Sequence, residues 1–261
     1  MVESGPLDIE NPFSAKLSTL RVHTPARIAL RRTGASIATP AALEFTLAHA
    51  SARDAVHAAL SLPTLLTELH RRSLPTLTLR SAALDRVTYL RRPDLGRTLS
   101  EASRAVLESQ APALANDPRP RLTILIADGL SALATDRHAV PLLDALLPLL
   151  GAWHLTPILL AEQARVAFGD HAGQLLHADL TLMLLGERPG LSAADSLGAY
   201  ITWAPQPGRT DAERNCISNI REGGLSHAAA AARIGFYLAE AGRRRLTGTH
   251  LKDPARQTLL P

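Results

Sequence analysis

The chain has 261 residues and a formal net charge of +4, with 46% hydrophobic and 20% charged residues, which suits one large or two small globular domains. No run of about 18 apolar residues occurs, and no basic segment leads into an apolar stretch, so we expect no membrane association and no secretion signal. Aromatic residues amount to only 3%, too few for base-stacking surfaces, so we expect no nucleic-acid partner. The single cysteine excludes an internal disulfide, and we expect a cytoplasmic location.

The first part of the chain shows helical patterns after a short tail. Residues 1–20 contain few periodic apolar positions, and we expect a poorly structured N-terminal tail there. Helical patterns follow at residues 25–62, 62–78 and 100–110. We therefore predict a helical N-terminal domain over residues 21–115.

The pattern changes after residues 111–121, which contain three prolines and an Asn-Asp pair and are typical of a linker. Beyond this linker, apolar runs alternate with helical patterns. The expected strands are 122–127, 155–160, 180–185 and 197–203, and the expected helices are 139–150, 170–177 and 226–244. Such alternation predicts βαβ units, so we expect residues 116–261 to form an α/β domain with a mostly parallel sheet.

Polar turns follow the predicted strands. Asp128–Ser131 comes after the first strand and Glu187–Gly190 after the third, while Cys216 follows the last. Ligands of parallel sheets bind beyond the carboxyl ends of the strands, so we expect a ligand site built from these three segments. The GxGxxG and GxxxxGK[ST] motifs are both absent, and the ligand need not be a nucleotide.

Each candidate residue has two explanations. Glu187 could accept hydrogen bonds from a ligand, or it could be a surface turn residue paired with Arg188. Cys216 has no neighbours that suggest a catalytic triad or a zinc site, and it could be a small buried side chain. His138 lies in Asp-x-His-x-x-Pro, which departs by its proline from the Asp-x-His-x-x-Gly motif that supplies a cobalt ligand in some corrinoid proteins. A histidine near the surface at the start of a helix is the expected alternative.

Several segments, taken in order, resemble the small (light) subunit of ethanolamine ammonia-lyase. The shorter matches are Arg165-Val166 and the Gly223-Gly224 turn. The longer matching stretches are Thr24–Ile28 (TPARI), Tyr89–Arg97 (YLRRPDLGR), Ile126–Ser131 (IADGLS), Leu185–Leu191 (LGERPGL) and Cys216–Ile220 (CISNI). They extend over residues 21–245, and the ordered set is far more specific than any single match.

The resemblance implies a complex in which adenosylcobalamin lies between a large barrel subunit and this chain, with six copies of each subunit. It also implies a Rossmann-like C-terminal domain for cobalamin binding, preceded by the helical N-terminal domain. The family's cobalamin contacts fall on Val166, Glu187 and Cys216. In this family the cofactor keeps its own dimethylbenzimidazole as lower ligand, so no residue of the chain is expected to bind cobalt. The chain departs from the family at Ala164, where a glycine is frequent.

The implied reaction is the radical conversion of ethanolamine to acetaldehyde and ammonia by a lyase that is active only as the two-subunit complex. The substrate and radical chemistry belong to the large subunit, and we expect no catalytic acid, base or nucleophile on this chain. Many relatives enter a bacterial microcompartment through an N-terminal amphipathic helix, which residues 1–20 do not show. The rival hypotheses are a stand-alone Rossmann-like enzyme for another small ligand and an interaction subunit without ligand contacts.

Overall fold

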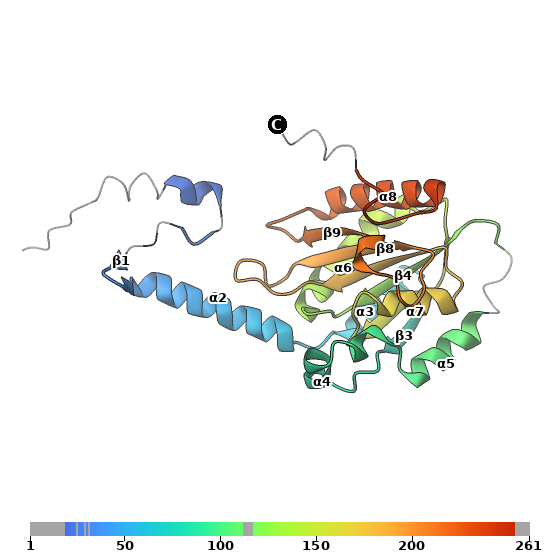
Figure 1. Cartoon of the computed structure of the whole chain (residues 1–261), viewed down its shortest axis with the longest axis horizontal. Helices are drawn as coiled ribbons and strands as arrows, with labels where there is room; N and C mark the ends of the chain where they lie inside the picture. The colour runs from blue at the N-terminus through green and yellow to red at the C-terminus, as the bar shows by residue number, and fades with distance from the viewer. Residues whose placement is uncertain (1–18, 25, 29, 31, 112–116, 254–261) are drawn as a thin grey trace, which may run out of the picture.

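A computed structural model of the chain describes residues 19–24, 26–28, 30, 32–111 and 117–253 (Figure 1). Residues 1–18 of the predicted tail and residues 112–116 of the predicted linker lie outside the described residues. The helices are η1 (Leu20–His23), α2 (Thr39–His57), α3 (Leu62–Arg71), α4 (Arg86–Arg91), η2 (Leu95–Arg97), α5 (Glu101–Gln110), α6 (Ala132–Leu146), η4 (Leu147–Leu149), α7 (Phe168–Leu175), η5 (Asp211–Glu213) and α8 (His227–Arg244). The strands are β1 (Arg32–Thr33), β2 (Ser36–Ile37), β3 (Thr76–Arg80), β4 (Arg121–Ala127), β5 (His154–Leu155), β6 (Ile158–Glu162), β7 (Leu180–Gly186), β8 (Leu197–Trp203) and β9 (Arg214–Ile220).

Seven strands of the described residues form one sheet in the order β3-β6-β4-β7-β8-β9, with the short β5 paired to the beginning of β4. β3, β6, β4 and β7 run parallel to one another. β8 is antiparallel to β7, and β9 is antiparallel to β8. The α/β class and the mostly parallel sheet are therefore confirmed. The antiparallel part was not predicted. No α-helix separates β7 from β8 or β8 from β9, and such direct connections are typical of antiparallel strands.

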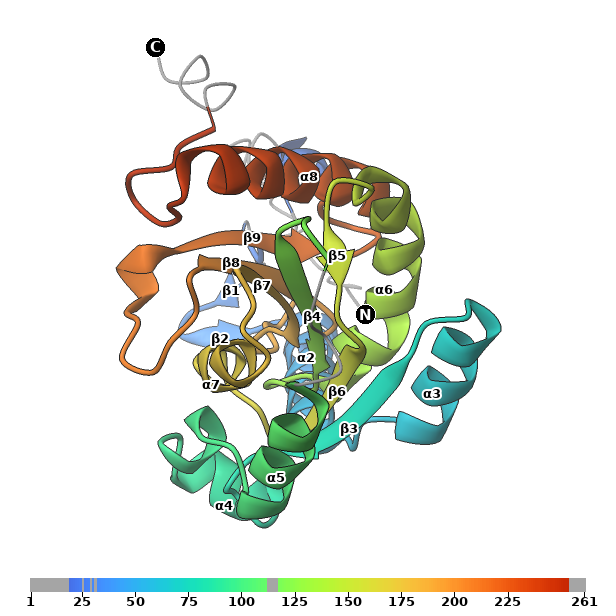
Figure 2. The ribbon, with the colours of Figure 1, turned by 90° about the vertical axis from the view of Figure 1, so that its right-hand side faces the viewer.

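Helices cover both faces of the sheet (Figure 2). On one face, α3, α6 and α8 pack over a core that includes Ile124 and Leu182. On the other face, α5 and α7 cover a smaller core that includes Leu125 and Met183. Because β4 and β7 are buried on both faces, they appear in the sequence as nearly continuous apolar runs.

The chain changes direction across the sheet at β4. From β4 it passes through α6 to β6 on one side, and from β6 it returns through α7 to β7 on the other side of β4. A crevice for ligands is expected beyond the carboxyl ends of strands at such a switch point.

Several strands differ from the sequence expectations. β1 and β2 lie within residues 25–62, where a helical pattern was predicted, and pair antiparallel ahead of α2. The stretch 62–78 was expected to be helical, but α3 ends at Arg71 and Thr76–Arg80 forms the edge strand β3. Its Thr-Leu-Thr-Leu-Arg sequence has the two-residue alternation of a strand. β9 was not predicted, because polar residues occupy most of its positions. The strand expected at 155–160 is divided into β5 and β6 by Pro157, which has no N–H to donate to a ladder.

The helix expected at 139–150 begins earlier, at Ala132, and continues through Pro141 to Leu146. Ser131 caps it by accepting a hydrogen bond from the Ala134 backbone N–H at 3.2 Å. Leu142 and Leu143 are fully buried beyond the proline, and this tertiary packing outweighs the local cost of proline within a helix.

α2 extends away from the sheet as an arm that carries exposed apolar side chains (Figure 1). Leu43, Phe45 and Leu47 are 64%, 48% and 69% exposed, and Ala55, near the end joined to the body, is its buried residue. None of the helices in the described part of the chain combines the length and apolar character needed to cross a bilayer.

Candidate functional site

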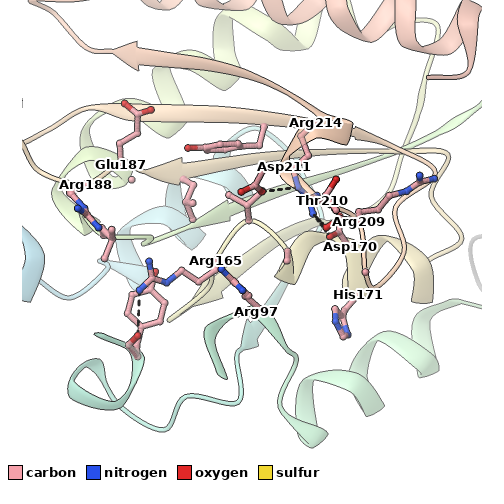
Figure 3. Close-up of a pocket in the computed structure, with 18 residues that line it drawn as sticks. Arg97, Arg165, Asp170, His171, Glu187, Arg188, Arg209, Thr210, Asp211 and Arg214 are labelled. Atoms are coloured by element: carbon pink, nitrogen blue, oxygen red, sulfur yellow. Dashed lines mark hydrogen bonds and ion pairs between the residues drawn. The ribbon is translucent and has the colours of Figure 1, made fainter. Parts of the chain in front are cut away.

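A cleft of about 900 Å³ opens beyond the carboxyl ends of β4, β6 and β7 and continues between α7 and the adjacent face of β8 (Figure 3). The volume lies at the upper end of the range of about 300–1,000 Å³ that is usual for small-molecule sites. Its walls come from the β4–α6, β6–α7, β7–β8 and β8–β9 connections, together with Tyr89 and Arg97. Two of the three segments expected to build a ligand site, Asp128–Ser131 and Glu187–Gly190, contribute to the lining of this cleft, whereas Cys216 does not line it.

Asp128, the first residue after β4, ties this turn to the segment that follows β6. Its carboxylate accepts hydrogen bonds from the backbone N–H groups of Gln163 and Ala164 at 3.0 and 3.2 Å. The Arg86 guanidinium lies 3.1 Å away. Burial raises the pKa of Asp128 to about 6, because it outweighs the effects of Arg86 and the backbone donors. Asp128 thus positions the cleft wall, while Leu130 of the same turn lines the cleft.

Val166 lies in the wall between β6 and α7, half-buried at the edge of the smaller core. The preceding residue is fixed from the backbone, since the Arg165 N–H donates to the Gly96 carbonyl at 2.8 Å. Because its side chain is apolar and lines the cleft, Val166 can offer a ligand an apolar contact. Ala164, the point of departure from the family, is fully buried beneath this segment.

Glu187 lies directly after β7 on the cleft wall, and its carboxylate is held from two sides. The Ser196 hydroxyl donates to Oε2 at 2.5 Å, and the Asn219 backbone N–H donates to the same oxygen at 3.1 Å. No described residue forms a hydrogen bond to Oε1. Gly198 leaves room for this carboxylate, because a Cβ there would lie 3.0 Å from Oε1. The surface pair with Arg188 does not form, so Glu187 presents one unbonded acceptor.

Cys216 is exposed on the edge strand β9, so the expectation of a small buried side chain is wrong. It pairs in register with Tyr200, a residue of the cleft wall, and the two side chains lie within hydrogen-bonding reach. Burial raises the pKa of Tyr200, and the neighbouring Cys216 and Glu187 raise it further. Cys216 thus borders the cleft through Tyr200, and it also lines a separate small hollow with Tyr237 and Arg233.

The far end of the cleft holds charged residues that the sequence analysis missed. Arg214 binds Asp170 of α7 through two hydrogen bonds of 2.6 Å, and both residues are buried. Burial raises the pKa of Asp170, against the lowering effect of Arg214. Asp170 and Arg214 are 44 residues apart. No local signal marked them as a pair, because Arg214 lies in a largely polar strand and α7 carries other polar side chains besides Asp170.

His138 lies on the other side of the sheet and takes no part in the cleft. It is buried within α6, and its Nδ1 lies 3.1 Å from Nε2 of His227 at the start of α8. The expected surface histidine is therefore wrong. Asp136 is engaged elsewhere, because its carboxylate accepts a hydrogen bond from the Ser61 backbone N–H at the start of α3. Among residues 19–111 and 117–253, so far as they are described, no cluster of histidine, cysteine and carboxylate side chains could hold a metal ion.

These features define a class of protein: an α/β fold whose ligand cleft is open on one side and has fixed polar and apolar wall residues. The model of the ethanolamine ammonia-lyase light chain family matches residues 14–252. The chain belongs to this family.

Curated relatives agree with this assignment. The chain is 51% identical over 261 residues to the ethanolamine ammonia-lyase small subunit of Pseudomonas fluorescens, covering 99% of this chain and 93% of the relative. It is 54% identical over 249 residues to the subunit of the same name from Azotobacter vinelandii, covering 94% and 90%. The subunit from Pseudomonas aeruginosa strain LESB58 is 51% identical over 248 residues, covering 94% and 89%.

Proposed function

We propose that this chain is the small subunit of an adenosylcobalamin-dependent ethanolamine ammonia-lyase and holds the cofactor against a large catalytic subunit. The observation that carries the proposal is the cleft itself: Val166 and Glu187 lie on its walls and Cys216 borders it. The three residues come from three separate segments, and the family resemblance implies cobalamin contacts at these same three positions.

The chemistry of the wall fits a corrinoid. Val166, Leu185 and Tyr200 offer apolar surface to a flat macrocycle. The corrin ring carries amide side chains, and the Oε1 atom of Glu187 can accept a hydrogen bond from an amide N–H. The carboxylate is already held by Ser196 and Asn219, so little conformational freedom is lost when it binds a ligand.

When bound, the cofactor supplies a radical that initiates the elimination of ammonia. The residues of this chain bind and orient it. Tyr200 and Val166 would form an apolar wall that excludes water, and Glu187 would hold a polar group of the cofactor. Cys216 would pack against the cofactor without binding cobalt. No acid, base or nucleophile for the substrate is assigned to this chain.

The exposed apolar side chains of α2 favour the proposal that a large protein subunit binds this chain. Leu43 and Leu47 are four residues apart and share one face, while Phe45 lies on roughly the opposite face. A helix that is apolar on opposite sides is normally buried, but α2 is largely exposed in this chain. We infer that the large subunit covers it in the complex.

Four finer assignments belong to the same proposal. They are the Rossmann-like character of residues 116–261, the helical domain at residues 21–115, an assembly of six copies of each subunit, and a cytoplasmic or microcompartment location. The participation of β3 in the main sheet means that a domain boundary near residue 115 would separate paired strands. Limited proteolysis of the complex would test this boundary.

The function is tested by measuring acetaldehyde released from ethanolamine by the matching large subunit with adenosylcobalamin, with and without this chain. We expect activity only when both chains are present. Activity of this chain alone would favour the stand-alone enzyme, and full activity of the large subunit alone would remove the role proposed here. Equilibrium titration of the complex with cobalamin should show binding that neither subunit achieves alone.

A further inference from the structure

The arginines that line the cleft fall into two groups. Arg209 and Arg214 are paired with Glu213 and Asp170, at 2.5 and 2.6 Å. The second group is Arg97, Arg165 and Arg188. No carboxylate oxygen of the described residues lies within 4.0 Å of a guanidinium nitrogen in this group. The cleft thus contains positive charge that the described part of the chain does not neutralise.

Two of these arginines, Arg97 and Arg165, are brought together by one tight backbone approach (Figure 3). The Arg165 N–H donates to the carbonyl of Gly96 at 2.8 Å. A Cβ at Gly96 would lie 2.8 Å from the Tyr89 ring and 3.0 Å from Cγ of Arg165. Glycine at position 96 is therefore needed for this approach, which places the two guanidinium-bearing side chains on the same part of the wall.

Arg165 is held in place before any ligand binds. Its guanidinium carbon lies 4.4 Å from the centroid of the Tyr89 ring, and Nη2 lies 3.5 Å from the Tyr89 carbonyl. The Tyr89 hydroxyl in turn donates to the Ala164 carbonyl at 3.0 Å. The Nε atom of Arg165 is buried and has no hydrogen-bond partner among the described residues. A buried cationic donor without an acceptor is unfavourable, so this side chain is suited to a negatively charged ligand.

The acidic groups of the cleft lie apart from this pair. Asp170 and Asp211 contact Arg214 at the far end, and Glu187 is held by Ser196. α7 begins at Phe168, so the positive end of this helix also points toward the segment that contains Arg165. Arg188 follows Glu187 and lies beside it, separate from the Arg97–Arg165 pair (Figure 3).

We propose that Arg97 and Arg165 form an anion subsite that binds a phosphodiester. This inference rests on the proposed function, in which the anion is the phosphodiester of the nucleotide tail of cobalamin. The amide side chains of the corrin ring are neutral, so the tail provides the one fixed negative charge for this pair. Two planar guanidinium groups with several N–H donors match the oxygens of a phosphate.

The test compares two corrinoids on the assembled two-subunit complex. Cyanocobalamin contains the nucleotide tail, whereas dicyanocobinamide has the same ring without the tail phosphodiester. We expect Arg97→Gln to weaken cyanocobalamin binding about tenfold, and the double change with Arg165→Gln to weaken it further. The Kd for dicyanocobinamide should not change. Arg97 is exposed, so its variant remains informative if the change at Arg165 impairs folding.

Arg91→Gln is the matched control, since Arg91 is an exposed arginine of α4 outside the cleft wall. It removes the same charge and should leave both affinities unchanged. The subsite is wrong if the Arg97 and Arg165 variants bind cyanocobalamin like the wild type, or if they lose both corrinoids equally. A wild-type complex that binds neither corrinoid would instead contradict the proposed function.

Inorganic phosphate distinguishes the cofactor from a free anion. We expect phosphate to compete weakly with cyanocobalamin on the wild-type complex and to have no such effect on Arg97→Gln. If Arg97→Gln loses phosphate binding but keeps its cyanocobalamin affinity, the pair binds free phosphate, and the assignment to the nucleotide tail is overturned.

Discussion

The Ser196 hydroxyl donates a hydrogen bond to the Glu187 carboxylate, with 2.5 Å between the two oxygens. Ser196 precedes β8 and Glu187 follows β7, so this bond closes the connection between two antiparallel strands at the mouth of the cleft. The Asn219 N–H, from β9, adds a second donor to the same oxygen. Three neighbouring strands thus fix one acceptor.

The Glu187 carboxylate, held through Oε2, leaves its Oε1 atom to accept a hydrogen bond from cobalamin. Glu187→Gln keeps the shape of the side chain but removes its charge, and it should weaken cobalamin binding to the assembled complex about tenfold. Equilibrium titration measures the effect, and size-exclusion chromatography checks assembly. Ser196→Ala should produce a smaller loss, because the carboxylate remains but is less well positioned. Unchanged affinity in Glu187→Gln would contradict the role given to this residue.

The raised pKa of Asp128 predicts that the free energy of unfolding depends on pH. Its pKa is about 6 in the folded chain and 3.8 when unfolded, so the folded state binds the proton more tightly. The stabilisation from protonation is complete below the unfolded pKa and is lost as the pH rises through the folded pKa. Relative to Asp128→Asn, the wild type should lose about 3 kcal/mol of unfolding free energy between about pH 4 and about pH 7. Urea unfolding at several pH values measures this difference.

Asp144 offers a control of opposite sign. The Arg72 guanidinium lowers the pKa of Asp144 through a hydrogen bond, so its stabilisation is present above the unfolded pKa and is lost as the pH falls. Relative to Asp144→Asn, the wild type should therefore gain stability as the pH rises. If both variants show the same sign, the assigned burial of Asp128 is not the cause of its pH dependence.

The sequence predicted the parts of the fold that depend on local signals. β4 and β7 are apolar runs, and α5 and α8 begin after the serine caps Ser100 and Ser226. β9 could not be predicted in this way, because Asn215 is buried through hydrogen bonds to the Gly248 and Leu251 carbonyls, more than 30 residues away in sequence. Such burial depends on the folded chain and leaves no local pattern.

The candidate site shows the same division. Glu187 was recognisable because it follows an apolar strand and a glycine. The Arg97–Arg165 pair was not recognisable as a unit, because it depends on the contact between Gly96 and the segment after β6. Family resemblance supplied Val166, for which the sequence pattern alone gave no ligand role, and it added a cobalamin contact to Cys216, whose segment the strand pattern had already placed at the expected site.

Gly186 should be intolerant of any side chain. A Cβ there would overlap the Ser131 carbonyl oxygen, and it would also crowd the Asp128 carbonyl. Because both contacts are with backbone atoms, they cannot be relieved by a rotamer change. We expect Gly186→Ala to lower the unfolding free energy by about 3 kcal/mol or more. Gly151→Ala is the control, since nothing lies within 4 Å of its added Cβ; equal stability of the two variants would contradict the close approach.

Cys216 provides a chemical probe of the cleft. It is the only cysteine of the chain and is exposed, so iodoacetamide should label it readily in the complex without cofactor. At a cobalamin concentration about ten times the Kd, about one tenth of the clefts remain free, and labelling should slow about tenfold. Mass spectrometry of the Cys216 peptide separates this signal from cysteines of the large subunit. An unchanged labelling rate at saturation would place the cofactor away from Cys216.

The α2 arm should be needed for assembly and not for folding of the body. Leu43→Glu with Leu47→Glu places charges on one apolar face, and we expect it to abolish co-purification with the large subunit. The unfolding free energy of the isolated chain should change by less than about 0.5 kcal/mol per substitution, because both side chains are exposed. Thr46→Glu adds one negative charge between the apolar faces and should leave assembly largely intact. Normal assembly of the double variant would show that the large subunit does not cover this face, and loss of folding would show that the arm stabilises the body itself.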